Sequence, residues 1–447
     1  MTPNFDRVAR FIAEPDVPAS ARSVAALLLI DTLGVSAGAI DLEPSRIARE
    51  FAVDFHAAPK TENAAPILFD GRMASIPGAA FAGATQIDNL DGHDGFNPVK
   101  GHIGCAVVPA LFAFAQSMPE LTARAALDLL AMSYEIAGRA GLALHGTVSD
   151  YHTSGAWNAL GVAALGCAMR GANPTQLREA LGIAEYHGPR SQMMREIQYP
   201  TMLHDGSGMG AFVGSMATLL ALRGFQGAPA ITIENDEVTQ FWADLGTRWT
   251  IAENYIKPYP ICRWAHAPLD GLTALMRDHK LTHENIASVE VGTFTESAAL
   301  YPGVPTTTGQ AQYSLPFALA ILLKHGHVGP EHIAGEGLND TAVAALLPRI
   351  KVHVSDHHNA TFPAKRMADV TVTLTDGTRL SSGNVHARGG LDAPLTEAEV
   401  EEKFGNFAGP QLGPVRTKAI WAMRDALLQP ETLFADLAAL VVPAPAH

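Results

Sequence analysis

Apolar residues recur at helical spacing through about half of the chain. Between about residues 17 and 250 the sequence is rich in Ala, Leu and Gly, and apolar side chains return every three or four positions, as at Val24 and Leu27 and again at Leu127 and Leu130. This spacing predicts a succession of helices with buried faces.

One of these helices has a clear start. Asn173 stands directly before Pro174 in a segment that continues with helical spacing to Leu181. An Asn side chain can cap the free N–H groups of a first turn, and Pro at the first helical position gives up no hydrogen bond. We therefore predict a helix that begins at Pro174.

The pattern changes after the Lys-Pro-Tyr-Pro sequence at 257–260. Short runs rich in β-branched residues follow, and they predict strands at Ser288–Thr293, Ile350–Val354 and Asp369–Leu374. The last run continues across Asp376-Gly377, a dipeptide that suits a tight hairpin turn. This part of the chain is therefore expected to be a second domain of mixed structure.

Helical spacing returns near the C-terminus, at Glu397–Phe404 and Val415–Leu428. These helices are expected to rejoin the first domain, which makes the mixed region an insertion. The predicted fold is mainly α, with a large all-helical domain over residues 1–256 and 395–447 and a smaller inserted α+β domain over residues 257–394.

Composition then excludes several classes of protein. With 447 residues, 47% of them hydrophobic and 17% charged, the chain should fold compactly, and a net charge of −14 without a basic run argues against nucleic acid as a partner. Cys105, Cys167 and Cys262 form no Cys-x-x-Cys pair, which favours a reducing cytoplasm over a disulfide framework or zinc ribbon. The apolar run Val24–Ile30 ends at Asp31 and no basic stretch precedes it, so neither a signal peptide nor a membrane span is predicted.

The densest group of polar residues is the segment 86–102, which contains Asp, His and Lys residues between predicted buried helices. A Gly- and Pro-punctuated connection between rigid elements is a common place for a functional site. The spacing of Asp88, Asp91 and Asp94 is three rather than two, which disfavours an EF-hand calcium loop. A solvated surface loop is the remaining alternative.

A second polar group, at 145–155, contains His145 and His152. His152 precedes Thr153-Ser154-Gly155 at a predicted helix start, where free N–H groups favour an anion such as a substrate carboxylate. The alternative is that His152 and Thr153 only cap the next helix.

The third group lies at the domain boundary, over residues 254–266. Lys257, Arg263 and His266 fall within ten residues there and suit an anionic substrate, because small-molecule sites are frequent at domain boundaries. Surface ion pairs are the alternative explanation.

Other motifs lack the context they need. Gly206–Ala211 matches G-x-G-x-x-A, but no strand precedes it, so close helix packing is predicted instead. The pairs His325/His327 and His357/His358 offer metal-type side chains without a companion Cys or carboxylate cluster in the sequence, and no metal is predicted from them.

Four stretches of the chain share their pattern with a known family. They are Asp31-Thr32-Leu33-Gly34, the segment 91–102, the segment 257–262 with His266, and Pro394-Leu395-Thr396 followed by Lys403-Phe404. Taken together, these stretches resemble the MmgE/PrpD family over essentially the whole chain. The resemblance implies a large all-helical domain, a smaller α+β lid, a homodimer, and neither a metal nor an organic cofactor.

The family includes a 2-methylcitrate dehydratase, a cis-aconitate decarboxylase and an iminodisuccinate epimerase. By position, the resemblance implies catalytic roles for Asp91, His102, His152 and Lys257. We further predict that the residues that bind substrate are Asp94, His145, Arg263 and His266.

Two positions depart from the pattern of the dehydratases and decarboxylases. Thr201 stands where those members carry a Lys, and Phe317 where a Tyr is common. The loss of a cation and a phenol weakens the case for protonating a leaving group and for binding a citrate-type tricarboxylate.

The reactions of this family all make or quench a carbanion next to a carboxylate, which requires a base and a cationic group. His102 and His152 are expected to be base and acid, in an order that the sequence leaves open, while Asp91 orients an imidazole and Lys257 stabilises the developing negative charge.

Epimerisation needs only removal and return of a proton, so the two departures favour an epimerase of an amino- or imino-dicarboxylic acid, most similar to iminodisuccinate epimerase. A lyase of the 2-methylcitrate dehydratase or cis-aconitate decarboxylase type is the alternative enzyme. A catalytically silent dicarboxylate-binding scaffold is the alternative from another class. The expected partners are a small di- or tricarboxylate and a second copy of the chain, with no nucleic acid and no membrane.

Overall fold

The computed structural model describes residues 1–443, which fall into two compact units. Unit 1 consists of Met1–Met193, His204–Tyr255 and the chain from Val400 onward. Unit 2 consists of Ile256–Glu399 and the short segment Met194–Leu203. The predicted domain boundaries lie within a few residues of both ends of Ile256–Glu399, whereas the segment Met194–Leu203 carries no signal in the hydrophobic pattern.

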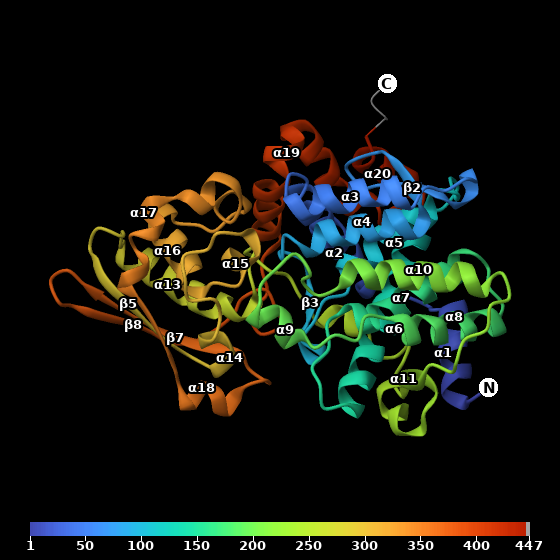
Figure 1. Cartoon of the computed structure of the whole chain (residues 1–447), viewed down its shortest axis with the longest axis horizontal. Coiled ribbons are helices and arrows are strands. Elements are labelled where there is room, and N and C mark those ends of the chain that lie inside the picture. Colours follow the sequence, from blue (N-terminus) through green and yellow to red (C-terminus); the bar gives the residue numbers. More distant parts are fainter. Residues whose placement is uncertain (444–447) are drawn as a thin grey trace. The chain divides into compact units, whose positions relative to one another are not determined.

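Helices dominate unit 1, and the sheets of the whole structure are small, which confirms the mainly α fold class with a smaller α+β region (Figure 1). The helices of unit 1 are α1 (Pro3–Ala13), α2 (Ala19–Gly38), α3 (Glu43–Phe55), α4 (Ile76–Asp88), α5 (Gly104–Ala115), α6 (Ala123–Thr147), α7 (Gly155–Met169), α8 (Pro174–His187), α10 (Ser207–Ala221), α11 (Ile231–Glu234), α12 (Thr239–Trp242), most of α19 (Glu397–Ala426), and α20 (Phe434–Val441). Two short antiparallel strand pairs join them, β1 (Ala64–Pro66) with β2 (Met73–Ser75) and β3 (Gly95–Phe96) with β4 (Asn254–Tyr255).

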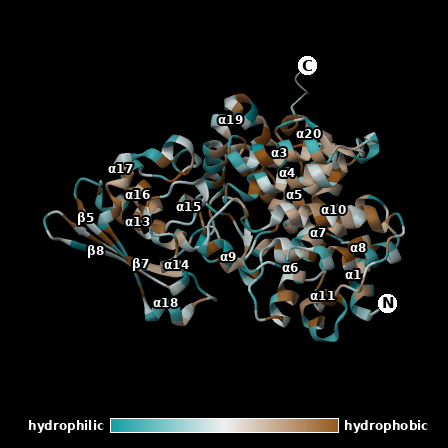
Figure 2. Ribbon diagram, in the orientation of Figure 1, coloured by the Kyte–Doolittle hydropathy of each residue, from teal (hydrophilic) through white to brown (hydrophobic). Residues whose placement is uncertain are grey.

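The core of unit 1 forms where apolar helices pack closely against one another. α7 lies against α6 and α10, and α4 lies against α5 and α10. Figure 2 shows hydrophobic residues gathered on these helices, while the connections are more hydrophilic. A Cβ on Gly210 would lie 2.0 Å from Asn158 Oδ1 and 2.9 Å from the Gly155 Cα, so only glycine permits this approach of α10 to α7. The prediction of close helix packing is therefore confirmed for Gly210, whereas Gly206 adopts a φ of +69° directly before α10 and makes no close contact.

The predicted helix at Pro174 is confirmed as α8. The Asn173 side chain accepts a hydrogen bond from the Gln176 N–H, and the Gln176 side chain accepts one from the Asn173 N–H, which completes a capping box. The predicted helices on both sides of the polar segment 86–102 are confirmed as α4 and α5.

Within residues 1–443, α2 alone is long and apolar enough to cross a membrane by length and composition. Of its most apolar window, 72% is buried inside the protein, and the helix packs against α4, α5 and α6. This burial is what a core helix of a folded domain shows.

Unit 2 is built around a four-stranded sheet with the order β6-β5-β7-β8. β6 runs parallel to β5, and the other neighbours are antiparallel. The strands are β5 (Ile286–Thr293), β6 (Ile350–Val354), β7 (Met367–Leu374) and β8 (Arg379–His386), and the helices are α9 (Met193–Gln198), α13 (His266–His279), α14 (Thr295–Ala298), α15 (Thr308–Gln312), α16 (Leu315–His325), α17 (Thr341–Ala344) and α18 (Asp356–Thr361).

The three predicted strands and the hairpin of unit 2 are confirmed. β7 turns into β8 at Asp376-Gly377, where Gly377 has a φ of +88°, a conformation that glycine adopts readily. Ala368, Val370 and Val372 alternate along β7 and are buried, and α13 covers β7 and β8.

The two predicted C-terminal helices are confirmed, and they follow one another across a kink within α19, the first of them extending past Phe404 to that kink. α19 runs from Glu397 to Ala426 and is interrupted only at Gly413, whose φ of 71° and ψ of 164° are not helical. Pro414 follows directly, and its ring restricts the conformation of the residue before it. The result is a kinked helix that carries Lys403 in its first half.

Candidate active site

The connection between α4 and α5 holds the candidate site of unit 1. Its polar residues are buried: Asp88, Asn89, Asp91, His93 and Asp94 are each at most 2% exposed. The backbone reverses at Asp91, which has a φ of +56°, and β3 then pairs with β4. The alternative of a solvated surface loop is therefore wrong, because flanking helices and β4 enclose this segment.

His102 is held in one orientation at the end of this connection. Its Nδ1 lies 2.5 Å from the carbonyl oxygen of Asp94, which can only accept, so Nδ1 carries a proton. Its Nε2 lies 3.4 Å from Oδ2 of Asp205. A neutral His102 therefore presents the lone pair of Nε2, the atom that a general base uses.

The hydroxyl of Ser154 links this histidine to the start of α7. Ser154 Oγ accepts a hydrogen bond from the His102 backbone N–H at 2.9 Å and donates one to Oδ1 of Asp205 at 3.0 Å. Asp205 also accepts the Gly155 N–H through its carbonyl oxygen at 3.0 Å. His102, Ser154 and Asp205 thus form one polar cluster. They come from the connection after α4, the start of α7 and the chain directly before Gly206.

A second histidine supports His102 from one side. The rings of His93 and His102 are perpendicular, with centroids 4.3 Å apart. His93 Nε2 lies 3.4 Å from Oδ1 of Asp88, whose Oδ2 accepts the Ser207 N–H at 3.1 Å. Asp88 therefore orients His93, and His93 limits the rotation of the His102 ring.

Asp94 turns its side chain away from His102, toward α5 and α6. A Cβ on Gly104 would lie 2.2 Å from Oδ1 of Asp94 and 2.4 Å from the Tyr134 hydroxyl, so glycine is required where α5 begins. Burial raises the pKa of the Asp94 carboxyl to about 7, and the nearby Asp31 carboxyl adds to the increase, while the Tyr134 hydroxyl and the Gly104 N–H oppose it. The predicted role of Asp94 in binding substrate remains a prediction.

Lys403 ties the same connection to two distant helices. Its Nζ lies 2.7 and 2.8 Å from the carboxylate oxygens of Asp31 in α2, and 2.8 Å from the carbonyl oxygen of Gly92. Both charged side chains are buried. Burial raises the pKa of the Asp31 carboxyl, against the opposing effect of Lys403. The ammonium group is therefore the main partner that keeps this carboxyl ionised.

The second predicted group is arranged around His145 and His152 of unit 1. His145 Nε2 accepts the His152 backbone N–H at 3.2 Å, and the two rings are nearly parallel with centroids 6.3 Å apart. Burial lowers the pKa of His145 to about 4, with further lowering from the Lys100 and His152 charges, so His145 is neutral near pH 7. Tyr151 donates its hydroxyl to the Lys100 carbonyl, which joins this group to the connection after α4.

The alternative that His152 and Thr153 merely cap α7 is wrong. Ser154 occupies the cap position and its side chain makes no capping hydrogen bond, while the Thr153 hydroxyl donates to the Pro189 carbonyl at 3.0 Å.

Unit 2 carries the remaining predicted residues. The Arg263 guanidinium donates to the carbonyl oxygens of Arg388 at 2.6 Å and Ala387 at 3.0 Å. His266 begins α13, and its Nε2 donates to the Ile261 carbonyl at 3.0 Å while its Nδ1 faces Arg263 at 3.4 Å. Lys257 is buried. The substrate-binding roles of Arg263 and His266 and the catalytic role of Lys257 remain predictions.

Comparison with known proteins gives the family. Residues 6–244 match the MmgE/PrpD N-terminal domain, and residues 259–429 match the MmgE/PrpD C-terminal domain. The chain belongs to the MmgE/PrpD family.

Two curated proteins with a named activity are similar in sequence to this MmgE/PrpD chain. Cis-aconitate decarboxylase of Mus musculus is 23% identical over 363 residues, which are 75% of this chain and 72% of the relative. Cis-aconitate decarboxylase of Homo sapiens is 23% identical over 412 residues, which are 86% of this chain and 83% of the relative. The family members are enzymes, and these relatives act on a small carboxylic acid.

The two departures from the MmgE/PrpD pattern both lie in unit 2. Thr201 is exposed, and its hydroxyl accepts the Leu203 N–H at 3.3 Å. Phe317 is buried in the first turn of α16, where its N–H is capped by the Ser314 hydroxyl. Thr201 cannot supply the positive charge of a lysine, and Phe317 cannot supply the dissociable proton of a tyrosine.

One group beside His102 has the composition of a metal site. Asp88, His93 and Cys105 offer ligand atoms within 4.8 Å of one another. Burial and the Asp88 charge raise the pKa of the Cys105 thiol well above its ordinary value, and its sulfur donates to the Ser207 hydroxyl at 3.2 Å. In this structure, the Cys105 sulfur is therefore a protonated donor to Ser207.

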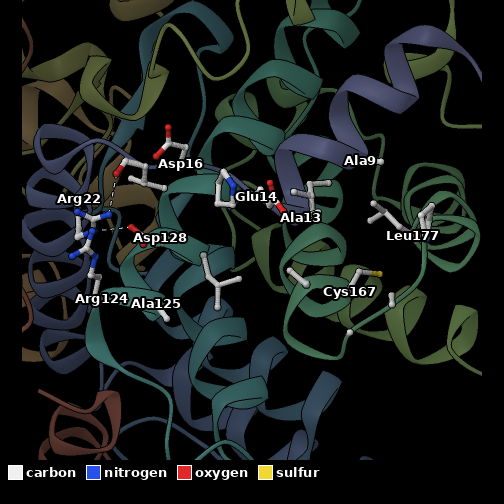
Figure 3. A pocket seen from close by; sticks show the side chains of 18 residues that line it. Ala9, Ala13, Glu14, Asp16, Arg22, Arg124, Ala125, Asp128, Cys167 and Leu177 are labelled. Carbon is white, nitrogen blue, oxygen red and sulfur yellow. Dashed lines mark hydrogen bonds and ion pairs between the residues drawn. The ribbon is translucent and has the colours of Figure 1, made fainter. Parts of the chain in front are cut away.

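Unit 1 also contains a cavity of about 670 Å³ between α1, α2, α6, α7 and α8. Figure 3 shows charged side chains at one end, where Arg22 bonds Asp128, and Cys167 and Leu177 toward the other. The cavity is lined by neither His102 nor His152 and is separate from the cluster around them.

The ion pair of Lys403 and Asp31 predicts a large stability effect. Lys403→Met leaves an uncompensated buried carboxylate, so the free energy of unfolding in urea should fall by about 3–5 kcal/mol. The double variant Asp31→Asn/Lys403→Met should recover part of this loss, because no buried charge is left. Lys418→Met, an exposed change on the same helix, is the control and should stay within about 0.5 kcal/mol of the wild type. Equal losses for Lys403→Met and Lys418→Met would contradict the prediction.

The raised pKa of Asp94 predicts a pH dependence. Folding favours the protonated carboxyl, so this contribution to stability is complete below pH 3.8 and is lost as the pH rises through about 7. Asparagine cannot ionise, so the wild type should lose up to about 4 kcal/mol of unfolding free energy relative to Asp94→Asn between pH 4 and 7. Urea titrations across this range measure the difference. Parallel pH profiles of the two proteins would contradict it, and the exposed Asp150→Asn is expected to follow the wild type.

Proposed function

We propose that this chain is a cofactor-independent enzyme that removes and returns a proton at the carbon α to a carboxylate of a small dicarboxylic acid. Within that class we propose an epimerase of an amino- or imino-dicarboxylic acid similar to iminodisuccinate. The observation that carries the proposal is the fixed orientation of His102.

His102 has what a general base needs. Its Nδ1 proton is held by the Asp94 carbonyl, which leaves Nε2 to accept a proton, and Asp205 lies 3.4 Å from that atom to stabilise the imidazolium that forms. The ring cannot turn freely because His93 packs against it. A base that is fixed in one tautomer loses no free energy to reorientation at the moment of proton transfer.

Epimerisation requires a second group that delivers a proton to the opposite face of the carbon. His152 is the proposed second group, since its backbone is fixed by His145 and its segment is joined to the His102 cluster through Ser154. Asp91 and Lys257 keep their predicted roles, the first in orienting an imidazole and the second in stabilising the carboxylate as negative charge builds on it.

Thr201 and Phe317 support epimerisation over elimination. Loss of hydroxide needs a proton donor for the leaving group, whereas exchange of one proton at carbon does not. A threonine hydroxyl already engaged by Leu203 and a buried phenyl ring are poor replacements for a lysine and a tyrosine.

A lyase is the second candidate, and the comparisons favour it. Both curated relatives are cis-aconitate decarboxylases, and their similarity spans most of the chain. The same His102 base and a cationic group would serve a decarboxylase, whose product carbanion must be protonated. A silent dicarboxylate-binding scaffold is the non-enzyme alternative, and it would bind such acids without exchanging their protons.

The test is incubation of the protein in D₂O with a panel of aminosuccinate, iminosuccinate-derived and citrate-type acids, followed by NMR and mass spectrometry. The epimerase predicts deuterium at the α-carbon with inversion and no other change in mass. Loss of water or carbon dioxide would replace it with a lyase. Tight binding without deuterium incorporation would leave only the scaffold.

Variants of the two histidines test the assignment of base and acid. His102→Ala and His152→Ala should each lower the exchange rate by about 10²–10⁴-fold, the usual contribution of a general acid or base. His187→Ala, an exposed change in the same unit, should leave the rate unchanged. Full activity of His102→Ala would contradict the proposal.

We further propose that the chain forms a homodimer. In unit 1, Phe51 and Phe55 are 43% and 73% exposed and contact one another, and Phe51 also packs against Phe81, which contacts Phe212. Such an exposed aromatic cluster is the kind of surface that subunit contacts cover.

Light scattering should therefore give twice the chain mass of 47.3 kDa. Phe51→Ser/Phe55→Ser should shift the equilibrium toward the monomer, because it removes the apolar surface that association would bury. Tyr186→Ser, at an exposed tyrosine of α8, is the matched control. A monomer at all concentrations would contradict the dimer, and an unchanged dimer in the Phe51/Phe55 variant would remove this cluster from the interface.

A further inference from the structure

Three histidines and two carboxylates gather where α16 ends in unit 2. α16 ends at His325, Gly326 reverses the chain with a φ of +78°, and the next residues bring the other side chains back to the same place. The members of this histidine cluster are His325, His327, Glu331, His332 and Asp340. The His-Gly-His motif is visible in the sequence, but only the fold brings the carboxylates of Glu331 and Asp340 next to it.

The geometry around Glu331 is that of an ion-binding group. Glu331 Oε1 lies 2.9 Å from Nε2 of His327 and 3.3 Å from Nδ1 of His332. These three residues offer ligand atoms that all lie within 4.8 Å of one another. Ligands around a tetrahedral zinc ion, at about 2.0–2.1 Å from the metal, lie about 3.3–3.4 Å apart, which is close to the distance from Glu331 Oε1 to Nδ1 of His332.

The hydrogen bonds fix which nitrogen of His327 faces the carboxylate. His327 Nδ1 lies 3.3 Å from the carbonyl oxygen of His325, which can only accept, so the proton resides on Nδ1. In the neutral ring, Nε2 would then direct a lone pair at a carboxylate oxygen. A proton on Nε2 removes this repulsion in the ion pair with Glu331, and a metal ion can replace that proton with both atoms as ligands.

The orientation of His332 also suits a metal ligand. Its Nδ1 accepts the Gly329 N–H at 3.1 Å, so this nitrogen carries a lone pair that a metal ion can take in place of that hydrogen bond.

His325 completes the surroundings of the group. Its ring stacks on that of His332 with centroids 4.6 Å apart, and its Nε2 lies 2.9 Å from Oδ2 of Asp340. Oδ1 of Asp340 accepts two N–H groups at the start of α17, which directs Oδ2 toward His325. Asp340 therefore holds the His325 ring, which packs against the ring of His332.

The backbone that carries the group is rigid. Val328 and Ile333 are buried at 4% and 0% exposure and anchor the segment in unit 2. A Cβ on Gly337 would lie 2.2 Å from the Glu331 carbonyl oxygen, so the chain packs closely against this residue. Ligands on a fixed backbone bind an ion with little loss of conformational entropy.

We propose that His327, Glu331 and His332 form a binding site for a divalent transition-metal ion of the zinc type, with His325 beside its open position. Two imidazoles and one carboxylate suit zinc, cobalt or nickel, whereas magnesium and calcium prefer oxygen ligands alone. The bound ion would fasten the end of α16 to the segment before α17.

The test is titration of the tag-free full chain with zinc chloride by calorimetry, and with cobalt chloride by absorbance. We expect one ion per chain, a tetrahedral cobalt spectrum, a raised melting temperature with zinc, and no competition from a large excess of magnesium. His327→Ala and Glu331→Gln should each weaken zinc binding by at least tenfold. Both side chains are more than half exposed, so these variants should fold normally, which circular dichroism without metal verifies.

His357→Ala is the matched control. His357 is another exposed histidine of unit 2 that contacts Asn384, and its removal should leave zinc affinity unchanged. Failure to bind one ion per chain, or equal affinity of the wild type and His327→Ala, would overturn the proposal. In either case the cluster would be a set of surface ion pairs.

Discussion

The buried ion pair between Lys403 and Asp31 is the constraint on which the candidate site depends. One ammonium group contacts a carboxylate in α2 and a carbonyl of the connection between α4 and α5, so three remote parts of the chain meet at a single atom. Taking these charges out of water is costly unless each has its partner, and the pair therefore admits few other arrangements of α2, α19 and the Gly92 backbone. The position of the following residues, up to His102, is set relative to that point.

The elements of both units follow from the sequence to a large extent, because hydrophobic spacing and capping residues act locally. Asn173 and Pro174 fix the start of α8, and Asp376-Gly377 fixes the turn between β7 and β8. α19 differs because the helix continues to the kink at Gly413 despite the weak apolar pattern before it. Packing within unit 1, where Phe404 and Phe407 are buried, supplies what local propensity does not.

The site was predictable only in part. The segment 86–102 is conspicuous in the sequence, and the structure places His102 and Asp94 together within it. From the sequence alone, its charged residues would nevertheless be expected to face solvent, because groups that enclose them come from other parts of the chain. Asp205 contacts His102 across about a hundred residues of chain, and no spacing rule connects the two. The support of His93 by Asp88 likewise depends on a helix end and a loop that meet only after folding.

The late position of Lys403 has a consequence for the order of events on the ribosome. The α2 helix and the connection around Gly92 are synthesised more than three hundred residues before the lysine that joins them. Until then, the Asp31 carboxylate has no counter-ion from α19 and must remain hydrated or protonated. The nascent chain can therefore form the helices of its first half early, but the arrangement around His102 becomes complete only when α19 has left the exit tunnel.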